Sequence, residues 1–284
     1  MAPGFLAVLS EPGNQVSLDE FHDWYDNEHI PLRLNHLPSF LSGARYRSID
    51  GVKPSWIAVY EIDDTKTFSD QSYTVLREKR SQREEDVMGR LEVLDRRTCE
   101  VVREVGEVNL RTTGLKVGNP SQWVVTHGVG RAATSKAGGI AETLDGDEFK
   151  EVVRWINEVV TKLESNLVGG WVKTRVLKVL ESAKTGTNFN KNGHSSSKEE
   201  QSVLSYFVFH GKSSIYILLT IHGLSDHFLA GGSEFVSEES ANSPTFREII
   251  EENSKASLQF SEFRQWELYK SYPCVAQGNV NLKA

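Results

Sequence analysis

The sequence predicts an α+β fold in which a β-α-β-β-α-β unit occurs twice and the two units close into one pseudo-dimeric barrel. Three observations predict it. Each half of the 284-residue chain opens with an apolar strand, GFLAVLS at 4–10 and QWVVTHGVG at 122–130. Each then reaches a helix that begins with Asp-Glu-Phe, at Asp19 and at Asp147. The strands at 4–10 and 56–60 are apolar on both faces, so the sheet needs a second cover, and the other half's sheet supplies it.

The first half is predicted to extend over 1–112. After its first strand and the helix from Leu18 comes the strand SGARYRSID at 42–50, in which β-branched or aromatic residues alternate with polar ones. The unit is then completed by the strand WIAVYEID at 56–63, a long helix over about 71–91 and the strand VLDRRTCEVVREV at 93–105. This order is the split βαβ, or ferredoxin-like, motif.

The second half, 113–284, is predicted to repeat this order. A helix from Gly146 precedes GGWVKTRVLKVLE, and the later elements are the strand IYILLTIHG at 215–223, a helix over about 244–258 and the strand at 260–272. A Gly/Ser/Asn/Lys-rich insertion at about 182–202 predicts a flexible loop. A hairpin turning at 211–213 would give this half one extra strand, and the polar stretch at 229–243 is either a lid or a surface connection.

Composition excludes several classes of protein. A formal net charge of −7 argues against a nucleic-acid partner, because phosphate binding needs a clustered basic surface. The basic cluster at 77–86 is interleaved with acids and predicts a solvated helix face. No apolar run is long enough for a membrane span, and the N-terminus lacks a basic secretion signal, so we expect a cytoplasmic protein without a membrane partner. Cys99 and Cys274 lie too far apart to suggest a local metal clip.

The stretch FHDWYDNEHIPLRL at 21–34 concentrates the reactive side chains. On a helix, four polar residues at i, i+4, i+7 and i+11 would form one stripe: His22, Asp26, His29 and Arg33. Pro31 predicts that the regular helix ends near Glu28 or His29. The helix dipole, together with Asp26 or Glu28, would then raise the pKa of His29. A histidine that titrates near neutrality can take and return a proton.

Neighbouring residues are predicted to hold a substrate. Arg33 and Arg45 could bind a carboxylate or oxyanion bidentately. Aromatic walls would come from four residues, Tyr25, Tyr46, Trp56 and Tyr60. On their strand Tyr46 faces opposite to Arg45 and Arg47, so only one set can face the expected cavity, which lies inside the barrel.

The pattern Phe-x2-Trp-Tyr-x2-Glu-His-x-Pro, from Phe21 to Pro31, resembles the EthD-like branch of the dimeric α+β barrel superfamily. The likeness covers roughly the first 110 residues. It implies a pocket for a small, often aromatic or polyketide-derived molecule, with His29 as the acid/base. Members include cofactor-independent oxygenases, cyclases, isomerases, decarboxylases and dehydratases, besides stress-response and haem-binding proteins. In the second half Val159 follows Glu158, which implies one catalytic pocket and a second half that serves as a wall.

We therefore expect a cofactor-independent lyase or isomerase that dehydrates, decarboxylates or cyclises an aromatic or polyketide-like substrate, with Glu28 or Asp26 orienting His29. The alternative is a non-catalytic small-molecule-binding or stress-response barrel whose polar stripe is only solvated. A haem protein with an axial ligand among His127, His210 and His222, and a cofactor-free oxygenase, are further alternatives. We expect no metal, since His22, Asp26 and His29 lack a further ligand nearby. A monomer or weak homodimer is expected, because the pairing surfaces are used internally.

Overall fold

The computed structural model of the protein describes residues 1–106, 120–131, 146–165, 171–189, 203–212, 246–252 and 258–278. Within these ranges eight strands form one closed antiparallel barrel, in the order β1-β3-β2-β8-β5-β7-β6-β4. The strands are β1 (Gly4–Glu11), β2 (Phe40–Ser48), β3 (Trp56–Ile62), β4 (Val93–Gly106), β5 (Trp123–Arg131), β6 (Trp171–Thr185), β7 (Tyr206–Lys212) and β8 (Leu258–Tyr272).

Each half of the chain contributes one run of four adjacent strands. The first half supplies β4-β1-β3-β2 and the second half supplies β8-β5-β7-β6. The barrel closes where β2 pairs with β8 and where β4 pairs with β6. Both seams therefore join one half of the chain to the other.

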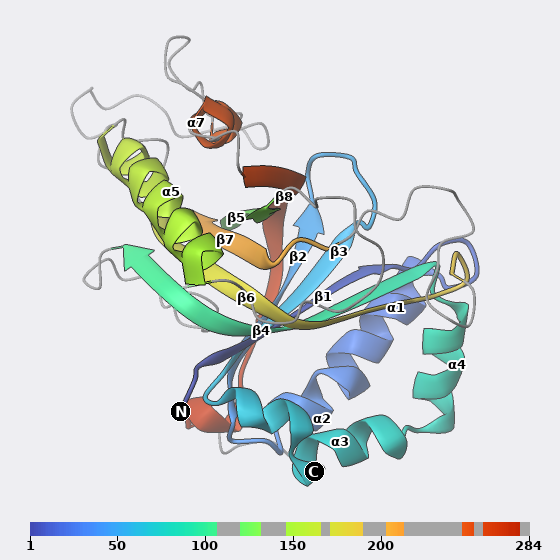
Figure 1. Ribbon diagram of the computed structural model, residues 1–284. Helices are drawn as coiled ribbons and strands as arrows, with labels where there is room; N and C mark the ends of the chain where they lie inside the picture. Colours follow the sequence, from blue (N-terminus) through green and yellow to red (C-terminus); the bar gives the residue numbers. More distant parts are fainter. Residues whose placement is uncertain are drawn as a thin grey trace, which may run out of the picture.

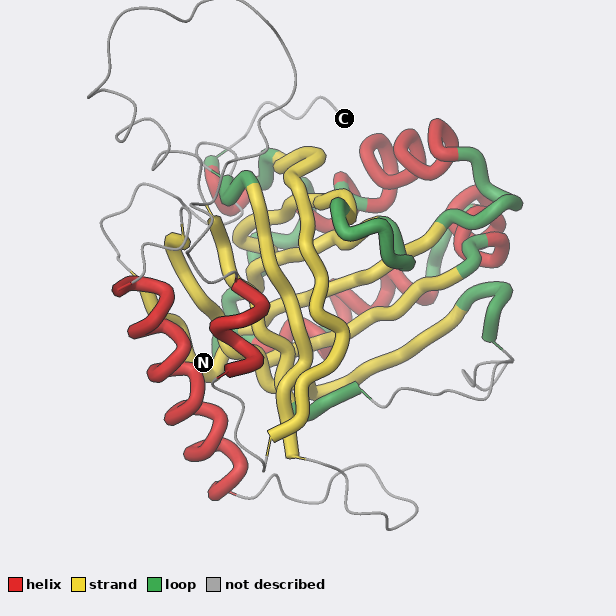
Figure 2. The backbone as a smooth tube through the Cα atoms, turned by 90° about the horizontal axis from the view of Figure 1, so that it is seen from above, coloured by secondary structure: helices red, strands yellow, loops and turns green. Residues whose placement is uncertain are grey.

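The helices lie outside the barrel in two groups (Figure 1). The first group is α1 (Leu18–Trp24), the π-helical turn η1 (Tyr25–His29), α2 (Pro31–Leu34), the 3-10 helix η2 (Thr65–Ser69), α3 (Gln71–Glu78) and α4 (Gln82–Arg90). The second is α5 (Gly146–Ser165) and α7 (Phe246–Glu252), while the short η3 (Val275–Gln277) follows β8. Figure 2, turned by 90°, shows the two groups on opposite sides of the strands.

Strand alternation separates the barrel interior from the layer beneath the helices. On β1, Phe5, Ala7 and Leu9 belong to the cluster inside the barrel, whereas Leu6 and Val8 pack beneath the first helices. The interior cluster also contains large residues of the other strands: Tyr46, Phe207, Phe209 and Trp266. Among the described residues the expected central cavity is therefore a packed core, as an eight-stranded barrel is just wide enough for side chains to fill it.

Two ion pairs cross the barrel interior between strands that are not neighbours, Arg175 on β6 with Glu61 on β3 and Arg97 on β4 with Glu262 on β8. Arg97 on β4 donates to Glu262 on β8 through Nη1 at 2.7 Å and through Nη2 at 2.9 Å. Asp95 accepts from the same guanidinium at 2.6 Å. Glu262 has a φ of 53°, the left-handed region, at an irregular part of β8. The bidentate pair thus fixes one half of the chain to the other inside the barrel.

Two predicted elements differ from the structure, and a third lies outside the described residues. The helix predicted over 71–91 is broken into α3 and α4, because Ser81 caps a new helix by accepting from Glu84 N at 3.0 Å. Residues 182–185, which we assigned to the flexible insertion, belong to β6, and 190–202 lies outside the described residues. The strand predicted at 215–223 also lies outside them, and β7 pairs with β5 and β6.

Candidate functional site

The helix that carries the candidate residues does not end before Pro31. Instead α1 widens into the π-helical turn η1, in which Ile30 N donates to Tyr25 O at 3.0 Å, and α2 begins at Pro31. A π-helical turn holds more residues than an α-helical one, so it rotates the side chains after it relative to those before it. The predicted polar stripe is thereby split, and its residues at the two ends of the turn meet different partners.

At the end of the turn, His29 meets an acid from another helix. Its Nδ1 lies 2.7 Å from Oε1 of Glu84 on α4, and the residues are 9% and 1% exposed. Although burial acts to raise the pKa of Glu84, the bond from His29 and the nearby Arg33 hold it below the usual range. An ionised carboxylate only accepts, so Nδ1 carries the proton and Nε2 keeps its lone pair.

The predicted rise in the pKa of His29 is wrong. Burial and, to a lesser extent, the Arg33 guanidinium together lower the pKa to about 4, although Glu84 opposes both effects. Burial outweighs the attraction of Glu84 because the charged ring would leave water. His29 is therefore a neutral imidazole at pH 7.

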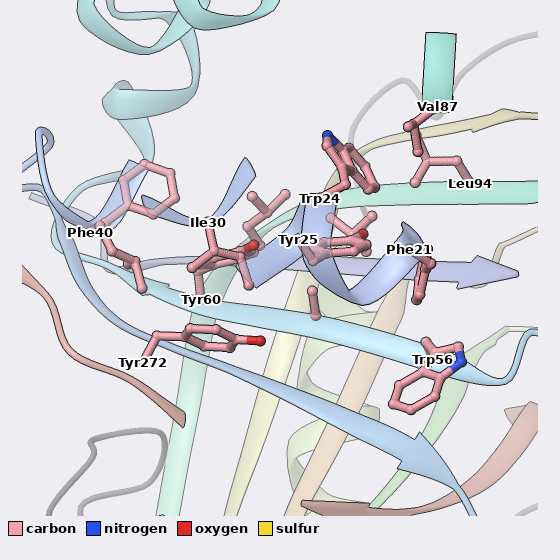
Figure 3. Packing of buried hydrophobic residues seen from close by; sticks show 14 of the residues in the cluster. Phe21, Trp24, Tyr25, Ile30, Phe40, Trp56, Tyr60, Val87, Leu94 and Tyr272 are labelled. Carbon is pink, nitrogen blue, oxygen red and sulfur yellow. The ribbon is translucent and has the colours of Figure 1, made fainter. Parts of the chain in front are cut away.

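Aromatic rings and Arg33 enclose His29. The ring centroids of Trp24 and Tyr25 lie 4.6 and 5.1 Å from that of His29. Arg33 Nη1 donates to the backbone oxygen of His29 at 2.5 Å, and its Nη2 lies 3.9 Å from Glu84 Oε1. Figure 3 shows Trp24 and Tyr25 in the layer between the helix and the sheet. Trp24, Tyr25, Arg33 and Glu84 therefore hold the imidazole in one orientation.

His22 before the turn and Asp26 at its start both meet Arg45 of β2. The guanidinium is 1% exposed, and its Cζ lies 4.3 Å from the centroid of Tyr25 and 5.3 Å from that of Trp56. Arg45 donates to Asp26 Oδ1 at 3.1 Å and to His22 Nδ1 at 3.0 Å. Since arginine only donates, Nδ1 of His22 carries no proton.

The two acids predicted to orient His29 have other partners in the structure. Asp26 accepts from the Tyr272 hydroxyl at 2.5 Å and from Lys270 Nζ at 2.9 Å, both on β8. Although burial opposes it, these bonds lower the pKa of Asp26. Glu28 accepts from Ser81 Oγ and lies 3.6 Å from Arg83 Nη1. Asp26 thus secures Arg45 and β8, whereas Glu28 secures the start of α4.

The predicted aromatic walls lie on two different faces of the sheet. Tyr46 points into the barrel, where its hydroxyl donates to Ser121 O at 3.1 Å and burial raises its pKa. Arg45, Trp56 and Tyr60 face the helices. The face of β2 that carries Arg45 therefore meets the candidate site. The buried hydroxyl of Tyr60 has no hydrogen-bond partner within the described ranges. Tyr46 is therefore separated from the other predicted residues.

Sequence reasoning missed Glu84, the direct partner of His29. It lies in the stretch 77–86 that we assigned to a solvated helix face, yet Glu84 is buried. The spacing of Ser81 and Glu84 is that of a helix-capping box, a local signal for the start of α4. No local signal pairs Glu84 with His29, 55 positions away.

Two predicted haem ligands form a pair on the strands of the second half. His127 Nε2 lies 3.1 Å from His210 Nε2, and both rings are at most 1% exposed. Nδ1 of His210 lies 2.7 Å from Thr174 Oγ1, which also accepts from Trp171 Nε1 at 2.9 Å. Each Nε2 thus faces another imidazole, and His222 lies outside the described residues.

The described residues contain neither a cluster of metal ligands nor a membrane-spanning helix. No group of three or more His, Cys, Asp or Glu side chains there is placed to hold a metal ion. None of the helices seen in those ranges is long and apolar enough to cross a membrane.

Comparison with known proteins gives structural neighbours only. No family model and no curated protein matches the sequence. An anthrone oxidase-like protein is 7% identical, with a TM-score of 0.45 over 95% of this chain and 92% of its own. A candidate monooxygenase of Fusobacterium nucleatum is 11% identical, with a TM-score of 0.40 over 96% and 98%. A candidate chlorite dismutase is 12% identical, with a TM-score of 0.45 over 95% and 96%. Agreement at this level carries no argument about the activity of this chain.

Proposed function

We propose that this chain is a small-molecule enzyme in which neutral His29 accepts and returns a proton, without a cofactor. The observation that supports this proposal most directly is the 2.7 Å contact between His29 Nδ1 and Glu84, both of which are buried. A carboxylate on one ring nitrogen fixes the tautomer and leaves the other nitrogen as the base, as in hydrolase triads. Glu84 replaces Asp26 and Glu28 as the orienting acid.

The reaction supported best is proton transfer at an acidic C–H or phenolic O–H. Nε2 would take the proton, the electron pair would remain on the substrate as an enolate or phenolate, and Glu84 would stabilise the imidazolium. Return of the proton to another atom completes an isomerisation. In a dehydration the imidazolium would give its proton to a β-hydroxyl, which leaves as water while the electron pair of the enolate forms the new double bond. In a decarboxylation Nε2 would instead take the carboxyl proton of a β-keto acid, CO2 would leave while the electrons of the broken C–C bond form an enolate, and the imidazolium would protonate the enolate carbon. Arg33, whose Nη2 lies 3.9 Å from Glu84 Oε1, would offset negative charge that develops on a substrate bound there.

We also propose that the two halves, 1–112 and 113–284, are ferredoxin-like repeats of an EthD-like, pseudo-dimeric α+β barrel. The strand orders β4-β1-β3-β2 and β8-β5-β7-β6 support this, because each run follows the same sequence of fourth, first, third and second strands. Both seams between the runs lie inside one chain, which supports a monomer or weak homodimer. A cytoplasmic location, expected from the sequence, is part of the same proposal.

A ligand screen with conversion assays tests the proposed function. Wild type, His29→Ala and the control His36→Ala would be screened by thermal shift against phenolic, quinone and β-keto acid compounds. Mass spectrometry would then follow conversion of each hit. Conversion by wild type and His36→Ala but not by His29→Ala supports the proposal. Undiminished conversion by a folded His29→Ala protein refutes it. His36 is exposed and lies after α2, so its loss controls for removing an imidazole.

The second candidate function is non-catalytic binding. The observation that favours it is the packing of His29, which is 9% exposed and lies against the rings of Trp24 and Tyr25. A histidine in such surroundings can serve as a satisfied core residue. In the same screen this candidate predicts hits that stabilise the wild-type protein without conversion, and a lower melting temperature for His29→Ala.

A further inference from the structure

Helix α4 covers His29, yet few apolar contacts hold it. Of its residues Gln82–Arg90, only Glu84 and Val87 are buried. Met88 is partly buried against the core beneath the first helices. Burial of apolar area is the main force that fixes a helix on a protein, so α4 is attached more weakly than a helix with a full apolar stripe.

Polar contacts on the outer surface join α4 to the segment 15–28. Glu28 accepts from Ser81 and lies near Arg83, Arg90 Nη1 donates to Gln15 O at 2.6 Å, and two ion pairs reach α1. Arg83 bonds Asp23, and Arg90 Nη2 lies 2.6 Å from Glu20 Oε1. The side chains are substantially exposed, from 29% for Arg90 to 54% for Asp23. An exposed ion pair changes the equilibrium between closed and open positions of a helix by less than about 5-fold, and salt weakens the pair. These contacts hold α4 closed only modestly.

The chain leaves helical geometry at both ends of α4. Lys79, before it, has φ −110° and ψ 55°, and Leu91, after it, has φ −58° and ψ 139°. Short non-helical segments at the ends of an element are where backbone rotation moves that element as a unit. Figure 1 shows α4 at the outer edge of the first helix group, beyond α1.

The closed position leaves one polar atom unsatisfied. Oε2 of Glu84 is buried and has no hydrogen-bond partner among the described residues, although Oε1 receives His29 Nδ1. A buried carboxylate oxygen without a partner destabilises the state that buries it. Opening α4 would return this oxygen to water.

We propose that α4 is a lid over His29, and that its closure brings Glu84 to His29 and so assembles the pair. The open lid admits a ligand to the imidazole, and the closed lid excludes water and fixes the tautomer. This inference rests on the proposed role of His29, but its test measures access to His29 rather than turnover. The two proposals can therefore fail separately.

The test is the rate at which diethyl pyrocarbonate modifies each histidine, read by peptide mass spectrometry. Exposed His36 is the internal reference. Raising NaCl from 0.1 to 1 M shortens the screening length to about 3 Å, so modification of His29 should accelerate relative to His36. Arg90→Gln should accelerate it about 2- to 5-fold at low salt. The matched control is Arg47→Gln, which removes the exposed pair with Glu267 on the strands.

A cross-link gives the converse measurement. In a Glu20→Cys, Arg90→Cys protein, a bifunctional thiol reagent would tie α1 to α4, while the native Cys99 and Cys274 are buried and protected. Modification of His29 should be fast before cross-linking and at least about 5-fold slower after it. Equal His29 rates in low salt, in high salt and after cross-linking would overturn the lid, whether or not His29 proves catalytic.

Discussion

Asp26, in the turn that follows the first helix, accepts a 2.5 Å hydrogen bond from the hydroxyl of Tyr272 at the end of the last strand. The same carboxylate receives Arg45 at 3.1 Å. One acid thereby connects the helix, β2 and β8, which come from both halves of the chain. The first-half site is therefore completed by the second half.

Loss of this hydrogen bond should destabilise the protein. Tyr272→Phe removes the donor and keeps the ring, so we expect a loss of about 1–3 kcal/mol in the free energy of unfolding, measured by urea denaturation. Tyr269→Phe on the same strand is the control, since no hydrogen bond of its hydroxyl is found in the described part of the chain and the residue is 40% exposed. Equal stabilities of the two variants would contradict the role given to Asp26.

The ion pair of Arg97 and Glu262 across the barrel interior should matter more than pairs on the surface. Glu262→Gln leaves Arg97 buried with Asp95 alone, so we expect a loss on the order of 3 kcal/mol, measured by chemical denaturation. Glu181→Gln removes a pair whose carboxylate is 58% exposed, and it should change stability by less than about 1 kcal/mol. The prediction fails if both variants unfold at the same denaturant concentration.

Acid should destabilise the protein through its buried histidines. Burial lowers the pKa of His127 from 6.5 to about 4. Between these values the unfolded chain binds a proton that the folded chain does not, so stability falls as pH falls from 6.5 towards 4. For one such group the loss approaches roughly 3 kcal/mol.

Substitution of His127 isolates its contribution to the loss of stability in acid. His127→Gln should flatten the dependence of unfolding free energy on pH between 6.5 and 4 by about one proton, whereas His36→Gln should not. Denaturation curves at several pH values measure the slope. An unchanged slope in His127→Gln would mean that His127 is charged in the folded protein.

The charge of Glu84 should tune His29. Glu84→Gln keeps an oxygen that can accept from Nδ1 but removes the attraction that raises the pKa of His29. The pKa of His29, followed by NMR, should therefore fall further, and any activity should fall about 10²–10⁴-fold. The control is Glu85→Gln, the neighbouring exposed position on α4. A rise in the pKa of His29 in Glu84→Gln would contradict the assigned contact.

The sequence predicted the parts of the structure that local patterns determine. The strands β1 to β4 follow alternation and apolar runs, and the first helix begins at Leu18 as predicted. The closeness of His29 and Arg33 follows from helical spacing. The opposite faces of Arg45 and Tyr46 follow from strand alternation.

Other features depend on contacts that a local pattern does not contain. The π-helical turn at 25–29 directs His29 towards α4, so the acid that contacts His29 is Glu84 rather than Asp26. The charge state of His29 depends on how completely α4 buries it. The large side chains of Phe209 and Trp266 fill the interior of the barrel. Strand alternation predicts which residues point inward but not whether their side chains fill the space.

The role of His29 as a base depends on its tautomer, which nitrogen-15 NMR assigns as a function of pH. We predict a neutral ring with its proton on Nδ1 at pH 7, persisting to about pH 5, because burial lowers the pKa to about 4. A charged imidazolium, or a neutral ring with its proton on Nε2 at pH 7, would contradict it. In either case Nε2 would have no lone pair to accept a proton from a substrate.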